Sequence, residues 1–250
     1  MAKDLFSRQS DLYAKYRPTY PKELYEYILS FVPGKNIAWD CATGNGQAAV
    51  VLADYFKKVI ATDISPSQIE KAVKKENIEY SVCPAESTPF ADNSFDLVTV
   101  AQAYHWIKWK EFKKEVTRVC KPNSVIAVWT YYSRTTDDEK IDKAVSDFYE
   151  NVTKPYWDYE RKYVDEKYST VEFDYEPLPV IDFETVLHWK REELLGYISS
   201  WSAIQKFIGV NGYSPISIIE EKLKRLWPED EEKKVVFPIY LKLGRVMKIM

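Results

Sequence analysis

Residues 37–49 read IAWDCATGNGQAA, and this stretch decides the fold. A short apolar run ends in the acid Asp40, Gly44 and Gly46 follow two residues apart, and apolar residues at helical spacing come next. A strand, a glycine-containing turn and a helix in this order begin a βαβ unit. The chain has only 7 glycines in 250 residues, so two of them in one turn indicate that backbone approaches a ligand closely there.

The same alternation of apolar runs and helical patterns continues to about residue 133. The predicted strands are 37–39, 58–63, 78–82, 95–101 and 125–129; the predicted helices include 66–75, opened by a capping box of Ser65 and Gln68, and 109–119. Apolar strands that do not alternate with polar residues fit a parallel sheet covered on both faces. The sequence therefore predicts a doubly wound α/β domain.

After residue 133 the regular alternation ends. The predicted elements are a polar helix at 137–152, a strand at Phe183–Trp189, helices at 191–203 and 214–226, a last strand at Phe237–Val246, and a solvated loop at Glu229–Lys234. Between 151 and 180 tyrosine, tryptophan and phenylalanine crowd together and no regular structure is predicted. Because Pro238 lacks an N–H, we expect it at the start of the last strand or at a bulge.

Composition excludes several classes of function. Hydrophobic residues make up 46% and charged residues 29%, and the formal net charge is −3, which argues against binding to duplex nucleic acid. No run approaches the roughly 20 apolar residues of a membrane span, and the N-terminus has no apolar signal region. Cys41, Cys83 and Cys120 show no metal-ligand spacing, so we expect no metal and a reducing, cytoplasmic location. Oligomeric state is not readable.

The glycine turn has two interpretations. Gly44-x-Gly46-x-x-Ala49 with Asp63 19 residues after the first glycine satisfies a dinucleotide fingerprint, so an NAD(P)-dependent oxidoreductase is one hypothesis. In a dinucleotide site the first glycine directly follows the strand, because the turn must present free backbone N–H groups to the pyrophosphate. Here four residues, Asp40 among them, separate the apolar run from the first glycine. A carboxylate at that point repels a pyrophosphate and attracts a ligand that carries positive charge.

The string from Ile37 to Gly46 resembles the first motif of class I S-adenosylmethionine-dependent methyltransferases, D-x-G-x-G-x-G, with Ala42 in place of the first glycine. The resemblance covers about residues 6–132 and returns weakly at 183–246. It implies a Rossmann-like, mostly parallel seven-stranded sheet in the order 3-2-1-4-5-7-6. It also implies S-adenosylmethionine, a sulfonium cation, as the cofactor. A non-catalytic protein that binds this cofactor is a further alternative.

The resemblance implies roles for individual residues. The implied cofactor-binding residues are Arg17, Asp40, Ala42, Gly44, Gly46, Asp63, Ile64, Ala85, Glu86 and Gln102. Of these, Asp63 would accept hydrogen bonds from both ribose hydroxyls, Ile64 would pack on the adenine, and Gln102 would lie beside the sulfonium. Pro84 stands where the family often has an acid. Arg17 would pair with the cofactor carboxylate, or it is an exposed arginine beside a proline turn.

Residues 13–21 and 101–106 resemble the trans-aconitate-methyltransferase-like group, whose members act on small molecules, several of them acids. The expected partner is therefore a small-molecule acceptor, with a carboxylate among the candidates, and neither nucleic acid nor membrane. His105 would be a general base, or would orient the substrate if the acceptor is a carboxylate. The expected acceptor pocket consists of Tyr20, Trp106, Trp129, Tyr131 and Tyr132.

These expectations define one methyltransferase domain over residues 1–250. Its predicted parts are an N-terminal helical cap at 1–30, a cofactor-binding core at 36–133, an inserted cover over the acceptor pocket at 134–182, and C-terminal strands and helices at 183–250 that complete the sheet. For the aromatic residues of 151–180, a satellite hydrophobic cluster is as consistent with the sequence as a cover.

Overall fold

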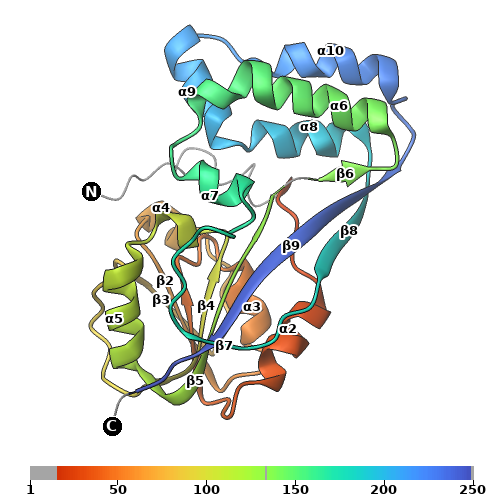
Figure 1. Cartoon of the computed structure of the whole chain (residues 1–250). Helices are drawn as coiled ribbons and strands as arrows, with labels where there is room; N and C mark the ends of the chain where they lie inside the picture. The colour runs from red at the N-terminus through yellow and green to blue at the C-terminus, as the bar shows by residue number, and fades with distance from the viewer. Residues whose placement is uncertain (1–15, 133, 249–250) are drawn as a thin grey trace.

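The computed structural model describes residues 16–132 and 134–248. A twisted mixed sheet has helices on both faces, and a separate group of helices lies beyond one end of its strands (Figure 1). The strands are β1 (Ile37–Cys41), β2 (Lys58–Asp63), β3 (Ile78–Val82), β4 (Phe95–Ala101), β5 (Cys120–Tyr131), β6 (Thr135–Thr136), β7 (Glu176–Pro177), β8 (Phe183–Trp189) and β9 (Lys233–Arg245).

The strand order confirms the predicted doubly wound architecture. Among the described residues, β3-β2-β1-β4-β5 are parallel neighbours, and β9 lies antiparallel between β5 and β8. This is the expected order 3-2-1-4-5-7-6, with β9 and β8 as its last two strands. The two-residue strands β6 and β7 also pair with β9, so the sheet has more than the seven predicted strands.

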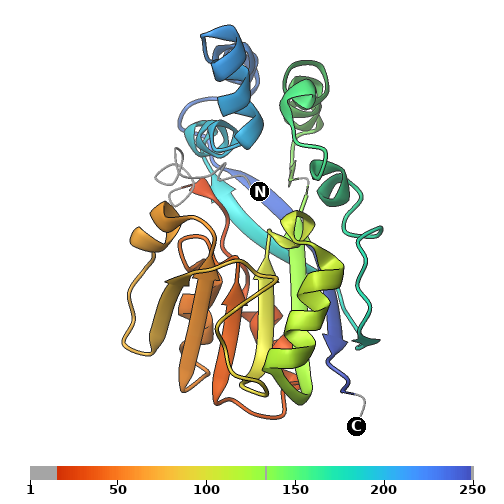
Figure 2. The same cartoon turned by 90° about the vertical axis from the view of Figure 1, so that its left-hand side faces the viewer.

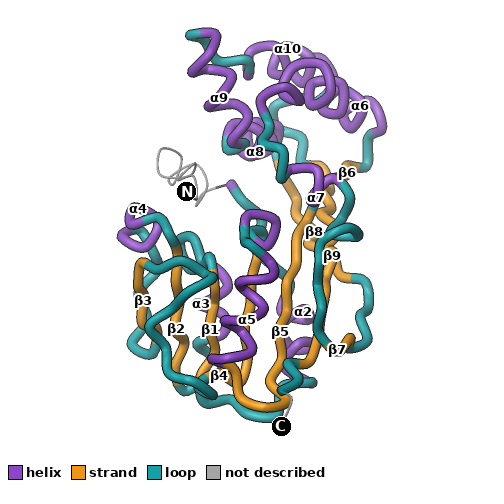
Figure 3. The backbone as a smooth tube through the Cα atoms, turned by 60° about the vertical axis from the view of Figure 1, so that its left-hand side comes forward, coloured by secondary structure: helices purple, strands orange, loops and turns teal. Residues whose placement is uncertain are grey.

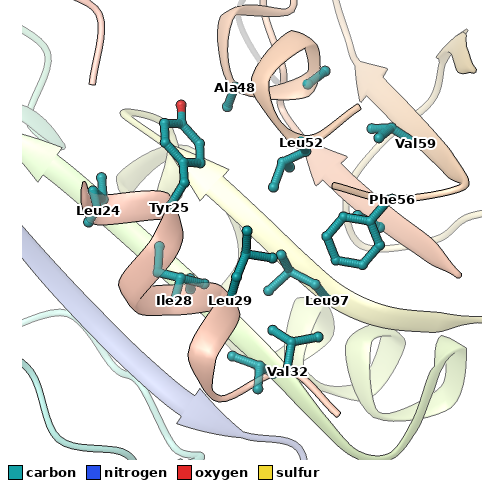
Figure 4. Packing of buried hydrophobic residues seen from close by; sticks show 14 of the residues in the cluster. Leu24, Tyr25, Ile28, Leu29, Val32, Ala48, Leu52, Phe56, Val59 and Leu97 are labelled. Atoms are coloured by element: carbon teal, nitrogen blue, oxygen red, sulfur yellow. The ribbon is translucent and has the colours of Figure 1, made fainter. Parts of the chain in front are cut away.

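Helices cover the sheet on its two faces. On one face α2 (Lys22–Ser30) and α3 (Gln47–Leu52) pack against the strands, and on the other α5 (Trp109–Val119) does so (Figure 2). Figure 4 shows Tyr25, Ile28 and Leu29 of α2 facing Leu52 and Leu97 in the first of these cores. Burial of these apolar side chains is the main term that fixes both layers.

The group of helices beyond the sheet, here termed the helical cap, stands over the carboxyl ends of the parallel strands (Figure 3). Its members are α6 (Glu139–Phe148), η3 (Tyr149–Thr153), η4 (Lys154–Tyr156), α7 (Arg161–Asp165), α8 (Arg191–Ser199), α9 (Ser202–Asn211) and α10 (Ile216–Leu226). Phe148, Ile198 and Leu223 meet Phe237 of β9 in a hydrophobic core of the cap, distinct from the two cores of the sheet. The long strands β8 and β9 connect the two parts.

Near the ends of the parallel strands, two local predictions were wrong. The helix predicted at 66–75 is α4 (Pro66–Glu70), and the side chain of Ser65 makes no capping hydrogen bond; its hydroxyl lies 3.0 Å from that of Ser67. The helix ends early because Val73 has tertiary partners: its N–H donates to Asn45 and its carbonyl accepts from the hydroxyl of Tyr80.

In the second half the structure shifts several predicted boundaries. The helix predicted at 191–203 is two helices, α8 and α9, with a break at Ser200, whose hydroxyl and carbonyl oxygens accept hydrogen bonds from Arg17. The helix predicted at 137–152 ends as α6 at Phe148 and continues as the π-turn η3. Such breaks come from contacts distant in sequence, which periodicity does not report.

The last strand also differs from its prediction. β9 begins at Lys233, so the predicted loop that includes Lys233 and Lys234 is shorter than expected. Pro238 lies inside this strand and not at its start. It is tolerated there because β9 changes its partner at this point: Val236 pairs with β6 and Ile239 pairs with β5, so the ladder on that side is interrupted at the proline.

The expected N-terminal cap lies partly outside the described residues, since the description begins at Tyr16. Within the described part, α2 covers a sheet face, with Leu24 and Ile28 almost fully buried. Only Arg17 and Tyr20 of this segment approach the strand ends where the cavities described below lie.

Candidate functional site

The loop after β1 has an unusual backbone. Ala42, Gly44 and Gly46 all have positive φ angles, of 55°, 57° and 86°. This left-handed region is accessible to glycine and costs a residue with a Cβ about 1–2 kcal/mol. The conformation turns the chain tightly between the strand and α3, and so brings its backbone to the edge of the sheet. Ala42 adopts this strained conformation at the position where the family that the sequence resembles has a glycine.

Asp40 is hydrogen-bonded to this loop from the interior of the protein. Its side chain is 1% exposed, and its carboxylate accepts hydrogen bonds from the hydroxyls of Thr43 and of Thr99 on β4, the latter at 2.7 Å. Burial raises the pKa of Asp40 to about 6, against the opposing effect of these hydrogen bonds. Asp40 is thus a negative charge behind the loop at neutral pH, and the prediction that it holds the ligand directly needs correction: it does not line the cavity in front.

Asp63, at the end of β2, lies in front of the same loop. Its Oδ2 accepts a hydrogen bond from the backbone N–H of Gly44 at 2.8 Å, and its Oδ1 accepts one from the N–H of Ser65 at 2.9 Å. These bonds fix the carboxylate across the two neighbouring strand ends, because β1 and β2 are parallel neighbours. Asp63 thereby faces a cavity next to the glycine loop.

Gly46 marks a close approach between two strand ends. A Cβ built at this position would collide with the hydroxyl of Tyr80 on β3 and come within 3.1 Å of its ring. The hydroxyl of Tyr80 is held by the carbonyl of Val73 at 2.7 Å and cannot move away freely. Gly46 therefore shapes the loop without itself lining the cavity.

The first cavity has a volume of about 270 Å³ and lies at the carboxyl ends of β1–β4. It is lined by Tyr20, Ala42, Thr43, Gly44, Asn45, Gln47, Ala48, Asp63, Ile64, Gln68, Cys83, Pro84, Ala85, Glu86, Ala101, Gln102, Ala103, Trp106, Ile107 and Glu160. Its ionisable lining includes the carboxylates of Asp63, Glu86 and Glu160, and no lysine, arginine or histidine among the residues the structure describes. This cavity is electronegative.

Most of the predicted cofactor residues meet in this first cavity. The structure brings there Ala42, Gly44, Asp63, Ile64, Ala85, Glu86 and Gln102, together with Tyr20 and Trp106 from the predicted acceptor pocket. Ile64 is 44% exposed although it is apolar, so its side chain is accessible to a ligand at the cavity wall. Glu86 accepts a hydrogen bond from the N–H of Lys108 at 3.0 Å. Gln102 has a left-handed φ of 58°, a second strained position at a strand end.

A second, smaller cavity of about 50 Å³ adjoins the first. It is lined by Arg17, Gln102, His105, Trp106, Trp157, Asp158, Arg161, Val164 and Ser202. Gln102 and Trp106 line both cavities, so the two are neighbours at the end of β4. Residues 157–202 supply most of the second wall, whereas the loops and helix starts that follow the parallel strands supply most of the first.

His105 is held in a neutral state beside the second cavity. Its Nδ1 lies 2.9 Å from the hydroxyl of Tyr168, and its side chain is 8% exposed. Burial, and the positive charge of Arg161, lower the pKa of His105 to about 3. A base this weak is a poor proton acceptor at neutral pH, so the lowered pKa argues against the general-base role and leaves orientation of the substrate as the other predicted role.

Four other predicted residues occupy different places. Arg17 lines the second cavity and not the first; it donates to Ser200 and, at 3.3 Å, to the hydroxyl of Tyr131. The prediction that Trp129 lines the acceptor pocket was wrong, because its ring is fully buried beneath Tyr20 at a centroid distance of 5.4 Å. Tyr131 packs in the cap core, and Tyr132 lies under the guanidinium of Arg161; neither lines the first or the second cavity.

Sequence reasoning missed the cap residues at the cavities. Trp157, Asp158, Glu160 and Arg161 all fall in the 151–180 segment, where only the abundance of aromatic residues was a signal. Other aromatics of that segment, such as Tyr168, pack into the sheet core. Charged residues next to tryptophan in an unassigned segment carry no periodicity that would place them.

Metal and membrane features are absent from the described part of the chain. No group of three histidine, cysteine or acidic side chains within residues 16–132 and 134–248 is arranged to hold a metal ion. In the same residues, none of the helices is long and apolar enough to cross a bilayer.

Comparisons with known proteins agree with this architecture. The family described as "Methyltransferase domain" matches residues 39–128. A candidate methyltransferase of Dictyostelium discoideum is 34% identical over 97% of this chain and 95% of its own length. A solved structure of a candidate type II methyltransferase from Anaeromyxobacter dehalogenans is 31% identical, with a TM-score of 0.85 over 94% of this chain and all of that one.

A candidate S-adenosylmethionine-dependent methyltransferase of Saccharomyces cerevisiae is 30% identical over 49% of this chain and 45% of its own length. The fold, the glycine loop and the near full-length relatives together place this chain in the class I S-adenosylmethionine-dependent methyltransferase family.

Proposed function

We propose that this chain binds S-adenosylmethionine in the first cavity and transfers its methyl group to a small-molecule acceptor in the second. The observation that carries the proposal is the charge of the first cavity, where Asp63, Glu86 and Glu160 face the space and the charge of Asp40 lies behind the loop. Such a cavity favours a sulfonium cation and disfavours the pyrophosphate of NAD(P). This argues against the oxidoreductase alternative.

The roles of individual residues follow from the family pattern and the geometry. Asp63 would accept hydrogen bonds from the ribose hydroxyls, and Ile64 would pack on the adenine next to Ala85 and Glu86. Backbone groups of the Ala42–Gly46 loop would hold the amino-acid end. Gln102, which lines both cavities, would lie beside the sulfonium.

Transfer to a carboxylate is the form of the reaction that this site supports best. A carboxylate oxygen forms the bond to the methyl carbon while the carbon–sulfur bond breaks, its electron pair stays on sulfur, and no proton moves. Neutral His105 then needs only to orient the acceptor. Holding nucleophile, methyl and sulfur in line supplies roughly 7–11 kcal/mol of the rate enhancement. Small acids, as in the group that residues 13–21 and 101–106 resemble, are therefore the acceptors of first choice.

Isothermal titration calorimetry tests the cofactor assignment. We expect micromolar affinity for S-adenosylmethionine and for S-adenosylhomocysteine, no heat with NADH, and loss of binding in Asp63→Ala. Asp230→Ala, in an exposed loop far from the cavities, is the matched control. Absence of heat with both adenosyl ligands would end the proposal. A panel of small acids and phenols with labelled cofactor separates an enzyme from a non-catalytic binding protein.

A further inference from the structure

The two neighbouring cavities differ in the sign of their charge. Arg17 and Arg161 line the second cavity, and Asp158 is its one acidic lining residue among those the structure describes. Asp158 is ion-paired with Lys206 and Arg161 with Asp165, so Arg17 leaves these groups with a net positive charge. The first cavity has only acidic ionisable groups among its described lining residues. A site that is negative on one side and positive on the other matches two ligands of opposite charge.

Trp157 supplies an independent sign of a missing hydrogen-bond acceptor. The Nε1–H of its indole is buried, and within the described residues it has no hydrogen-bond partner, although Trp157 lines the second cavity. An indole nitrogen is a donor only, and leaving it buried without an acceptor is unfavourable. Trp157 is thus a side chain at the cavity wall whose polar edge has no acceptor among the described residues.

Arg161 is held in one orientation next to this donor. Its Nε donates to Oδ1 of Asp165 at 2.9 Å, and its guanidinium carbon lies 4.3 Å from the centre of the Trp157 ring. The rings of Tyr132 and Tyr149 lie 5.6 and 5.7 Å away. A guanidinium fixed in this way loses little side-chain entropy when it binds an anion, and its planar fork matches a carboxylate.

We propose that the second cavity binds a carboxylate group of the methyl acceptor, with Arg161 as its donor and the ring of Trp157 holding that guanidinium in place. The inference rests on the proposed function, because it assigns the cavity to the acceptor. A free volume of about 50 Å³ holds roughly four water-sized atoms, which is the size of a carboxylate. Arg17, which also lines this cavity, adds positive charge.

Indole signals in ¹⁵N nuclear magnetic resonance spectra test this assignment. The chain has 8 tryptophans, and the spectrum of Trp157→Phe identifies the Trp157 signal by its loss. Sodium butanoate, titrated into protein saturated with S-adenosylhomocysteine, should shift that signal downfield and saturably below 20 mM. Butanamide, which has the same shape without the charge, should not.

Variants of the arginine complete the experiment. Arg161→Gln should weaken butanoate binding at least tenfold, Arg161→Lys should fall between, and Arg225→Gln, on the exposed face of α10, should change it less than twofold. Calorimetry with S-adenosylhomocysteine on the same variants shows whether the fold and the first cavity are intact.

The assignment would be overturned by no saturable shift with butanoate, by an equal shift with butanamide, or by undiminished binding in Arg161→Gln. Tighter binding of inorganic phosphate than of butanoate would also overturn it, in favour of a phosphorylated acceptor. Failure of the proposed function is distinguishable, because it appears as absent S-adenosylhomocysteine binding while the butanoate titration can still be measured on the ligand-free protein.

Discussion

The carboxylate of Asp40 accepts a hydrogen bond from the hydroxyl of Thr43, three residues further on. The acid that ends β1 therefore fastens the glycine loop from the inside of the molecule. Asp63 fastens the same loop from the outside, through the N–H of Gly44. Two carboxylates from neighbouring parallel strands thus hold one short loop, and only the outer one faces the cavity.

Asp40→Asn should change the pH dependence of stability. The folded pKa of Asp40, about 6, lies above its ordinary value of 3.8, so the folded state prefers the protonated form. Ionisation of Asp40 in the folded state lowers the free energy of unfolding. This loss is absent below about pH 4, grows as pH rises to about 6, and reaches roughly 2–3 kcal/mol. We therefore expect the free energy of unfolding of the variant, relative to that of wild type, to be higher by about that much at pH 7.5 than at pH 4. Urea unfolding at the two pH values measures this difference.

An equal difference between the two proteins at both pH values would contradict the raised pKa of Asp40. Asp230→Asn, in an exposed loop, serves as the control and should show the wild-type dependence.

Ala42→Gly should stabilise the protein. Ala42 has a φ of 55°, which costs about 1–2 kcal/mol for a residue with a Cβ, and glycine removes that strain. The greater conformational freedom of glycine in the unfolded chain lowers the free energy of unfolding by about 0.4–1 kcal/mol. We therefore expect a net increase in the free energy of unfolding of about 0.5–1 kcal/mol. Thermal unfolding measures it. Ala49→Gly, in the buried helix α3, should instead lose about 1 kcal/mol or more, and a loss in both variants would refute strain at Ala42.

Gly46→Ala should destabilise the protein and weaken cofactor binding. The added methyl group meets the Tyr80 hydroxyl at a φ of 86°, so we expect a loss of about 2–3 kcal/mol in chemical unfolding. Adding Tyr80→Phe should recover part of that loss, because it removes the nearest clashing atom. Gly209→Ala, in α9 with open space around its Cβ position, should be neutral or stabilising. No recovery in the double variant would mean that the clash is not the cause.

His105→Gln should lower turnover without changing the shape of its pH profile. Because the pKa of His105 is about 3, the imidazole is neutral from pH 5 to 9 and does not titrate there. Steady-state kinetics of both proteins with a small-acid acceptor measure this. An acidic limb near pH 6 that persists in the variant is expected from Asp40. A limb that disappears with His105 would restore the general-base role.

Much of the fold was predictable because short sequence patterns of apolar and turn residues determine it. The strands at 58–63, 78–82 and 95–101 match their predicted bounds, since an apolar run between turn residues is both the signal and the cause of a buried strand. The glycine loop and Asp63 were predictable too, because parallel strands bring their carboxyl ends to one edge of the sheet.

Other features exist only in the folded chain. The neutral state of His105 depends on burial and on the charge of Arg161 in the cap, and the break before α9 depends on Arg17, 183 residues from Ser200. The second cavity joins the end of β4 to Trp157 and Arg161 of the cap.

The sequence by itself determined the layered sheet, the loop after β1 and the acid that faces the cavity, because each depends on residues close together in the chain. The tertiary structure decided that Asp40 is buried, which tryptophan is buried and where positive charge meets the site. Those outcomes depend on desolvation and on side chains brought together from distant segments, and neither is encoded in residue spacing.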